Sequence, residues 1–569
     1  MPPYDAGMSA STASAPLQSR TSYARAARLA AAFACLAYPW LHPAARGPTY
    51  AVEPLLVSLL CVVLLLAVSA MEARTEVPRV LPAVAAAGAV LIWVSDFVAS
   101  GSFAPSPPAV AAWLVLAAIL ACSALGAIAR TGEEVFPWSA SLLAWVWLVA
   151  ALLSTVIALA QYFGVSDWLG PLAAYSPERH AYGNLRQKNH YATLANIGLL
   201  CAVWLTLHGK PALPRWLAAA ATLLLCAGTA ASASRTGAVQ LIAVLGLAAW
   251  WHRRAMSRAA WLFVPLLCYL AAALALFFVF DGAGRSGPSL VHRLAGDVPL
   301  CSSRTVLWQN MMQLVLERPW WGWGWRELAH SFYMGNFEPR FCALVFNAHT
   351  LPLHVAVEFG VPAALVLCAV CLWAIVRARP WAQSDPARGL AWGVIALIGL
   401  HSLVEYPLWY GPFQIALGLC LGMLCGSRTG LPVSRIGLGL AAAGFAAIAA
   451  YAAWDYHRVR QLYLPTAARA QAYQDDTFAK VRSTWLFRDQ LAYAQLARIP
   501  LHAETAKDAY ALASQVMHFS PEPRVIEKRI DAARLLGLDT EAAAEAARYR
   551  AAFPVAHAAW LRRSAPSSQ

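Results

Sequence analysis

The sequence predicts an all-α, polytopic integral membrane protein. Of its 569 residues 60% are hydrophobic and only 13% are charged, and the mean hydropathy is +0.52. Soluble domains carry about twice that fraction of charged residues. Apolar stretches of about 20 residues, the length that crosses a bilayer, recur between short charged or Pro- and Gly-containing connections. This composition excludes a soluble enzyme. The net charge of +14 is interpreted first as a topology signal, so no nucleic-acid partner is expected.

Thirteen apolar segments are predicted to be transmembrane helices. Arg20, Arg25 and Arg28 precede or begin the first of them, which we interpret as a retained anchor because no small-residue cleavage site follows it. The segments cover residues 28–42, 51–71, 80–99, 108–129, 138–163, 190–208, 215–232, 237–252, 259–281, 351–376, 389–404, 411–427 and 436–454.

The distribution of Lys and Arg orients these segments. With the N-terminus in the cytoplasm, the cationic short loops, such as the one with Arg253, Arg254 and Arg258, lie inside, as the positive-inside bias requires. Arg186 and Arg235 are exceptions because they fall in outer connections. Arginines on the outer side, where the positive-inside bias disfavours them, indicate a role other than setting the topology.

The predicted organisation has five parts. Residues 1–27 form a disordered cytoplasmic N-terminus, 28–281 the first group of membrane helices, and 282–350 a large outer loop. Residues 351–454 form the remaining membrane helices, and 455–569 an outer helical domain.

The C-terminal part differs in composition from the rest of the chain. Residues 456–569 carry 16 Lys and Arg and 11 Asp and Glu, with amphipathic helical spacing. The stretch from Pro521 to Pro554 predicts a helical hairpin that resembles one tetratricopeptide-type unit. An ordinary helical pair is an equal alternative.

Four polar clusters fall on the outer side of this map. They are residues 182–190, residues 232–237, the outer loop with residues 302–304 and 347–354, and residues 401–410. The orientation was assigned from charges in other loops, so this coincidence predicts one shared external site. Glu405, at the end of a span, is expected to be buried and paired, because a carboxylate at membrane depth needs a partner.

Five motifs in these clusters carry a resemblance to a known family. In chain order they read NLRQKNHYATL, SRTG, SRTVLWQNMMQLVLERPWWGWGW, NAHTLPLHVAVEFG and HSLVEYPLWYGPF. Together they resemble the bacterial protein O-oligosaccharyltransferases, the PglL-type pilin glycosylation ligases of the O-antigen ligase and Wzy polymerase superfamily. The chain departs from the family pattern at Lys188, where Pro is usual, and at Thr350, where Asn is common. Neither departure removes a matched functional side chain.

The resemblance implies a fold, a location and an activity. It implies a multi-pass enzyme of the bacterial inner membrane whose active site faces the periplasm. The donor would be an oligosaccharide on undecaprenyl diphosphate, and the acceptor a hydroxyl of Ser or Thr in a periplasmic protein such as a pilin.

Elementary chemistry selects the candidate binding residues. A polyprenyl diphosphate is already a good leaving group, so attack at the anomeric carbon mainly needs cations that hold the departing charge. Arg grips phosphate oxygens at two points and stays charged, which makes Arg186, Arg235 and Arg304 the candidates. The alternative for each is that it only reaches towards lipid headgroups.

A base is needed as well, because a hydroxyl is a weak nucleophile. His titrates in the useful range, and His349 lies where the long loop re-enters the membrane. The resemblance places the family's essential histidine there. It also matches Gln187 and Tyr410 to polar positions that orient donor or acceptor, with Tyr406 as a close rival. No metal and no cofactor are expected, since no Asp-x-Asp cluster or Gly-rich phosphate loop accompanies the outer motifs.

Several alternatives stay open from the sequence. Within the superfamily, the acceptor could be lipid A core, as for an O-antigen ligase, or a growing glycan, as for a polymerase. A transporter or flippase is a more distant interpretation, and a non-catalytic scaffold another. Cys301 and Cys342 could form a disulfide, because the outer face is oxidising, but the sequence leaves this open.

Overall fold

The computed structural model describes residues 15–43, 48–49, 51–70, 75–77, 79–131, 139–252, 260–280, 303–424 and 431–564. Within these residues seven helices are long and apolar enough to cross a bilayer, and further apolar helices are shorter. The chain is therefore an all-α, multi-pass membrane protein. Each predicted span coincides with a helical region, but thirteen crossings remain a prediction.

The helices of the membrane region follow the chain in this order: α1 (Ala15–Leu41), α2 (Val52–Ala70), α3 (Val80–Ser100), α4 (Pro107–Thr131), α5 (Ala140–Tyr162), α6 (Lys188–His208), α7 (Arg215–Ala231), α8 (Arg235–His252), α9 (Ala260–Ala275), α13 (Leu351–Phe359), α14 (Val361–Ala378), α15 (Pro386–Ser402), α16 (Gly411–Leu424) and α17 (Arg435–Arg460).

The structure differs from the predicted segments at two places. The segment 1–27 was expected to be disordered, yet it is helical from Ala15 onward, and residues 1–14 lie outside the described residues. The single span predicted at 351–376 is broken at Gly360 into α13 and α14. Gly360 has a φ of 89°, and a Cβ atom there would clash with the backbone oxygen of Trp320. The outer loop at Trp320 passes so close to the backbone at residue 360 that only glycine, which has no Cβ atom, fits there.

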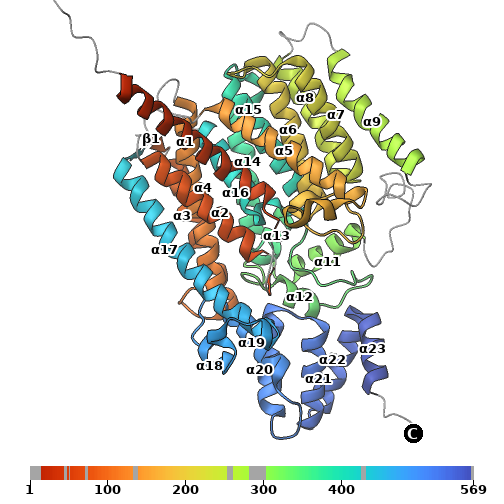
Figure 1. Ribbon diagram of the computed structural model, residues 1–569. Coiled ribbons are helices and arrows are strands. Elements are labelled where there is room, and N and C mark those ends of the chain that lie inside the picture. The colour runs from red at the N-terminus through yellow and green to blue at the C-terminus, as the bar shows by residue number, and fades with distance from the viewer. Residues whose placement is uncertain are drawn as a thin grey trace, which may run out of the picture.

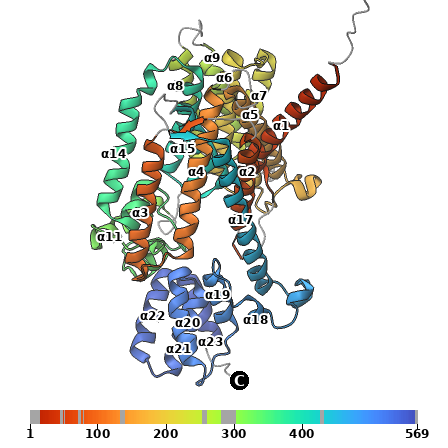
Figure 2. The same cartoon turned by 90° about the vertical axis from the view of Figure 1, so that its left-hand side faces the viewer.

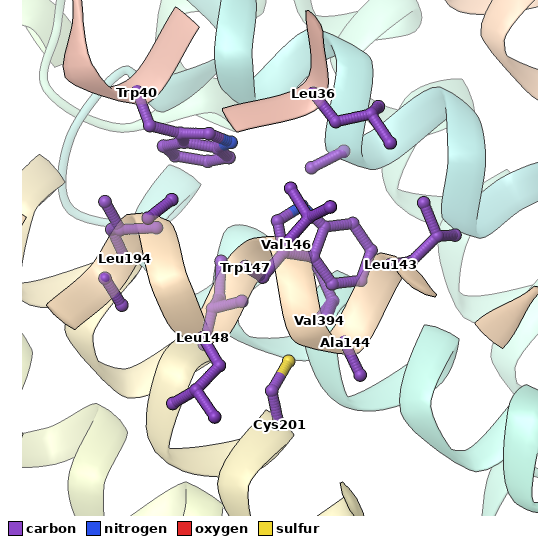
Figure 3. Packing of buried hydrophobic residues seen from close by; sticks show 14 of the residues in the cluster. Leu36, Trp40, Leu143, Ala144, Val146, Trp147, Leu148, Leu194, Cys201 and Val394 are labelled. Atoms are coloured by element: carbon purple, nitrogen blue, oxygen red, sulfur yellow. The ribbon is translucent and has the colours of Figure 1, made fainter. Parts of the chain in front are cut away.

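The centre of the bundle contains α5 and α6, which are the most buried of the seven long apolar helices. Trp147 of α5 is enclosed by side chains of α1, α6 and α15, among them Trp40, Leu194 and Val394 (Figure 3). Because lipid tails are as apolar as these side chains, close packing rather than exclusion of water holds such helices together. The N-terminus of α6 is thereby fixed in the middle of the protein.

A two-stranded ladder lies beside the end of α17 that is far from the C-terminal helices (Figure 1). Strand β1 (Thr75–Val77) pairs antiparallel with β2 (Leu431–Val433), and Thr75 lies opposite Val433. The ladder joins the connection after α2 to the connection before α17. Both connections were assigned to the cytoplasmic side by their charges, so the pairing agrees with that assignment.

The outer loop predicted at 282–350 is folded in its described part. It contains α11 (Arg304–Glu317) and α12 (Leu328–Met334), which share a small apolar core with α13. These three helices lie between the membrane bundle and the C-terminal helices (Figures 1 and 2). Cys342 is disulfide-bonded. Cys301 lies outside the described residues, so its pairing with Cys342 stays a hypothesis.

The C-terminal helices, which we call the tail, are α18 (Thr477–Val481), α19 (Arg488–Arg498), α20 (Ala506–Phe519), α21 (Pro523–Leu535), α22 (Asp539–Ala552) and α23 (Pro554–Ser564). The predicted helical pair is present as α21 and α22, which turn at Gly537 with a φ of 73°. Its assignment as a tetratricopeptide-type unit remains a prediction. Tyr333 of α12 enters the apolar core of the tail, and its hydroxyl donates to Glu545 Oε1 at 2.7 Å. The tail is thus attached to the outer loop.

Asp455 fastens the start of the tail to α17. This buried carboxylate accepts hydrogen bonds from the Thr484 hydroxyl at 2.9 Å and the Leu486 amide at 3.1 Å, and it pairs with Arg458 at 3.4 Å. Asp455→Ala should lower the free energy of unfolding of the tail by about 3–5 kcal/mol, because it leaves the Arg458 guanidinium buried without a counter-charge. Limited proteolysis at increasing denaturant concentration measures this change in the free energy of unfolding. Asp475→Ala, which removes an exposed pair with Lys480, is the control and should leave the cleavage midpoint unchanged.

Candidate active site

One carboxylate connects three of the four polar clusters. Glu405 lies in the turn 403–410 between α15 and α16, and its side chain is only 2% exposed. Its Oε2 atom accepts from His349 Nδ1 at 2.7 Å, and its Oε1 atom accepts from Asn189 Nδ2 at 2.9 Å and pairs with the Arg304 guanidinium. The predicted burial and pairing of Glu405 are therefore confirmed, and its partners come from distant segments.

Opposing effects act on the Glu405 carboxyl. Burial favours its neutral form, but the hydrogen bond from His349 and the charge of Arg304 outweigh burial and hold its pKa below the usual value. Glu405 is accordingly ionised at neutral pH. The buried negative charge compensates Arg304 and orients the imidazole of His349.

His349 occupies an uncommon backbone conformation. Its φ of 51° is left-handed, which costs a residue with a Cβ atom on the order of 1–3 kcal/mol, and such strain concentrates at functional sites. The Asn347 side chain supports the turn by accepting from the His349 amide at 3.1 Å. The ionised carboxylate of Glu405 accepts a hydrogen bond from Nδ1 of His349. The neutral imidazole therefore carries its proton on Nδ1, and its Nε2 atom can take up a proton. The side chain is 29% exposed, so a substrate can reach it.

Arg304 is the first residue of α11 and reaches Glu405 from the outer loop. Its side chain is 41% exposed. A guanidinium has five N–H donors in a planar fork, so pairing with one carboxylate oxygen leaves others for a phosphate group. The pair can therefore bind an anion next to His349.

Asn189 connects Glu405 to the remaining polar cluster, residues 232–237. Its Oδ1 atom accepts from the Ser234 hydroxyl at 2.6 Å, and the Ser234 oxygen accepts from the Gly237 amide at 3.0 Å, which caps the N-terminus of α8. Arg235 follows Ser234 as the first residue of α8 and is exposed. Arg235 is thus connected to Glu405 through Ser234 and Asn189.

A buried polar network lies below Asn189. The Thr193 hydroxyl bonds to Gln240 Oε1 at 2.9 Å and to His401 Nδ1 at 2.8 Å, and Gln240 donates to the Leu397 carbonyl at 2.8 Å. These bonds join α6, α8 and α15. Hydrogen bonds between these three helices limit their relative movement below Asn189.

Gln187 caps the N-terminus of α6. Its Oε1 atom accepts from the His190 amide at 3.1 Å and also from the Asn189 amide. Gln187 therefore fixes the helix turn that presents Asn189 to Glu405. This capping role is a local signal that the sequence contained.

The two candidate tyrosines line the same region at different depths. The Tyr406 ring meets His349 edge-on at 5.2 Å, whereas Tyr410 lies 4.1 Å from the buried ring of His190 and 6.3 Å from Tyr406. Tyr406 is thus the one in direct contact with the candidate base.

Arg186 lies at the edge of this arrangement. It is exposed, has a left-handed φ of 56°, and donates from Nη2 to the Pro43 carbonyl at 2.5 Å, just beyond α1. The structure therefore joins His349, Arg304 and Tyr406 directly around Glu405. Gln187, Tyr410 and Arg235 stand next to that group, and Arg186 stands apart from it.

Sequence reasoning missed two of the residues that hold this group together. Asn189 and Ser234 both lie inside motifs that had been singled out, but no role was predicted for either. The available signal was their position: each is a small polar residue at the start of an apolar helix, within two residues of a predicted arginine or glutamine.

Comparisons with known proteins cover the same segments. Three family models match: "Protein glycosylation ligase" over residues 181–205, "O-Antigen ligase" over 220–368, and "Virulence factor membrane-bound polymerase, C-terminal" over 390–567. A curated relative, the "General O-oligosaccharyltransferase" of Acinetobacter baylyi, is 24% identical over 308 residues. The chain is thus similar to the O-antigen ligase and protein glycosylation ligase families in three successive segments. The chain spans about half the length of this relative, as the match covers 51% of each protein.

The three matched regions meet at Glu405. The first region contributes Asn189, the second Arg304 and His349, and the third Glu405 itself with Tyr406. The residues that the fold brings together are thus distributed over all three family models.

Proposed function

We propose that this protein transfers an oligosaccharide en bloc from undecaprenyl diphosphate to a Ser or Thr hydroxyl of a periplasmic protein such as a pilin. The observation that carries the proposal is the group formed by His349, Glu405 and Arg304. It combines a base whose Nε2 atom can take up a proton with a cation that has donors to spare. The proposed place is the bacterial inner membrane, with the group facing the periplasm.

The transfer step follows from this geometry. His349 Nε2 takes the proton of the acceptor hydroxyl, whose oxygen forms a bond to the anomeric carbon. The bond from that carbon to the diphosphate oxygen breaks, and undecaprenyl diphosphate leaves with the electron pair. The Glu405 carboxylate stabilises the imidazolium that forms. Direct displacement inverts the anomeric centre and needs no metal ion at the reacting carbon.

The remaining candidate residues have binding roles in this proposal. Arg304, Arg235 and Arg186 bind phosphate oxygens of the donor, and their charge stabilises the departing diphosphate. Tyr406 and Tyr410 orient donor or acceptor from the side of α16. Gln187 acts by holding the start of α6.

Arg235 offers a test with a closely matched control. Arg235→Ala should raise KM for the lipid-linked donor about 10- to 100-fold, since a hydrogen bond to a charged group contributes about 1.5–3 kcal/mol. The control is Arg435→Ala. Arg435 also begins a helix after a serine whose oxygen accepts from the amide of a glycine at 3.0 Å, but it lies on the predicted cytoplasmic side. Equal effects of the two variants on KM would contradict a phosphate-binding role for Arg235.

A second candidate function has its own support. The models named for O-antigen ligase and for a membrane-bound polymerase match longer segments than the glycosylation ligase model does. Purified protein should be incubated with lipid-linked oligosaccharide and either a pilin-like protein or lipopolysaccharide that lacks O antigen. Glycan on the protein supports the proposal. Glycan on lipid A core, or chain extension of the donor itself, would replace it with ligase or polymerase activity.

A further inference from the structure

Three potential metal ligands meet where the outer loop contacts the tail. Glu327 and His330 lie at the beginning of α12, and His518 lies in the last turn of α20. Glu327 Oε2 is 2.8 Å from His518 Nδ1 and 3.3 Å from His330 Nδ1. The two imidazole rings lie against each other, with centroids 3.8 Å apart. Both histidines thus direct the same nitrogen at the same carboxylate oxygen.

These separations fit one small tetrahedral ion. Zinc binds His nitrogen and carboxylate oxygen at about 2.0–2.2 Å, so two ligand atoms of a tetrahedral site are about 3.4 Å apart. The observed distances of 2.8 and 3.3 Å are close to that value, and all three ligand atoms lie within 4.8 Å of one another. Two imidazoles and one carboxylate suit zinc, whereas calcium and magnesium prefer oxygen ligands only.

We propose that Glu327, His330 and His518 bind one Zn²⁺ through a carboxylate oxygen and the two Nδ1 atoms. Each neutral imidazole then carries its proton on Nε2. The side chain of His518 is 53% exposed, so water can occupy the fourth position. This site was not predicted from the sequence, because its third ligand is 188 residues away from the second along the chain.

The position of the cluster indicates what the ion does. Just before Glu327, the Trp323 and Gly324 amides donate to the carbonyl oxygens of Val357 and Glu358 at 2.8 and 3.1 Å. Those carbonyls belong to α13, which begins two residues after His349. The ion therefore clamps the tail to a segment that is bonded to the helix following the candidate base. It positions the tail and takes no part in the transfer step, so the inference does not depend on the proposed function.

Zinc titration of the full-length protein tests the inference. The protein is purified in detergent through a tag without histidine, treated with chelator, and titrated with Zn²⁺ against a chromophoric zinc indicator. Wild type should bind one equivalent with high affinity. His518→Ala and His330→Ala should each weaken that binding by about 100-fold or more, because a lost ligand costs at least as much as a lost outer-shell partner. His502→Ala is the matched control, since His502 is an exposed tail histidine that contacts Thr505, and it should bind zinc like wild type.

A second measurement separates loss of the ion from loss of the fold. Zinc should slow proteolysis of the tail in wild type and in His502→Ala, but not in His518→Ala, while all three proteins elute alike in gel filtration. Magnesium should protect none of them. If wild type binds no more zinc than the variant Glu327→Gln/His330→Ala/His518→Ala, the cluster is only a hydrogen-bonded contact and the inference is wrong.

Discussion

Replacing His349 with Ala is expected to abolish oligosaccharide transfer while membrane insertion and abundance stay normal. The side chain lies at the surface of the site, so its loss leaves no large cavity, but it removes the acceptor for the hydroxyl proton. General base catalysis contributes about 10²- to 10⁴-fold to a rate, and kcat should fall by that factor. Single-turnover transfer from lipid-linked oligosaccharide to a protein acceptor measures it.

His180 provides the control for this variant. It is a histidine of the predicted outer side whose Nδ1 atom also faces a carboxylate, that of Glu178 at 3.2 Å, and its exposure of 30% matches the 29% of His349. His180→Ala should keep wild-type kcat. Undiminished transfer by His349→Ala would refute the assignment of the base.

Glu405→Gln is expected to lower kcat about 10²- to 10³-fold. The substitution keeps the size of the side chain but removes the charge that compensates Arg304 and stabilises the imidazolium form of His349. Hydrogen bonds to charged groups contribute about 1.5–3 kcal/mol each, and two of them change here. Because the imidazolium exists only during the reaction, kcat should fall more than KM for the donor rises. Glu405→Asp, which keeps the charge, should recover part of the rate.

Glu358→Gln is the matched control for Glu405→Gln. Both carboxylates are buried to the same degree, with 2% exposed, but Glu358 faces His354 at 3.6 Å within α13 rather than the group around His349. Its kcat should stay within a few-fold of wild type, a range of about 1 kcal/mol. A Glu405→Gln enzyme with wild-type kcat would show that Glu405 only supports the fold.

Local patterns in the sequence predicted much of the fold, because they depend on short segments. The apolar stretches marked where the membrane helices lie, and the spacing from Pro521 to Pro554 predicted the pair α21 and α22. The break at Gly360 could not be predicted in the same way. It exists because Trp320, 40 residues earlier, passes against it, and no local pattern contains that contact.

The candidate site was likewise predictable only in part. His349, Arg304 and Tyr406 could be named from their motifs and their side of the membrane. The partners of Glu405 could not, because they are 56 residues away in one case and 101 in another, and they meet only once the bundle has packed. Burial of Glu405 followed from its position in the sequence, whereas its role as the common partner required the three-dimensional arrangement.

The short length of α13 has a consequence for how a lipid carrier could be used. Nine helical residues rise about 13 Å, less than half of the hydrocarbon thickness of a bilayer. The helix after His349 is therefore too short to cross a bilayer by itself, and the chain reaches the longer α14 only after the break at Gly360. In the proposed function, the diphosphate of the carrier would meet His349 beside this short helix and not within a helix that crosses the membrane, so its isoprenoid chain would not have to leave the acyl tails.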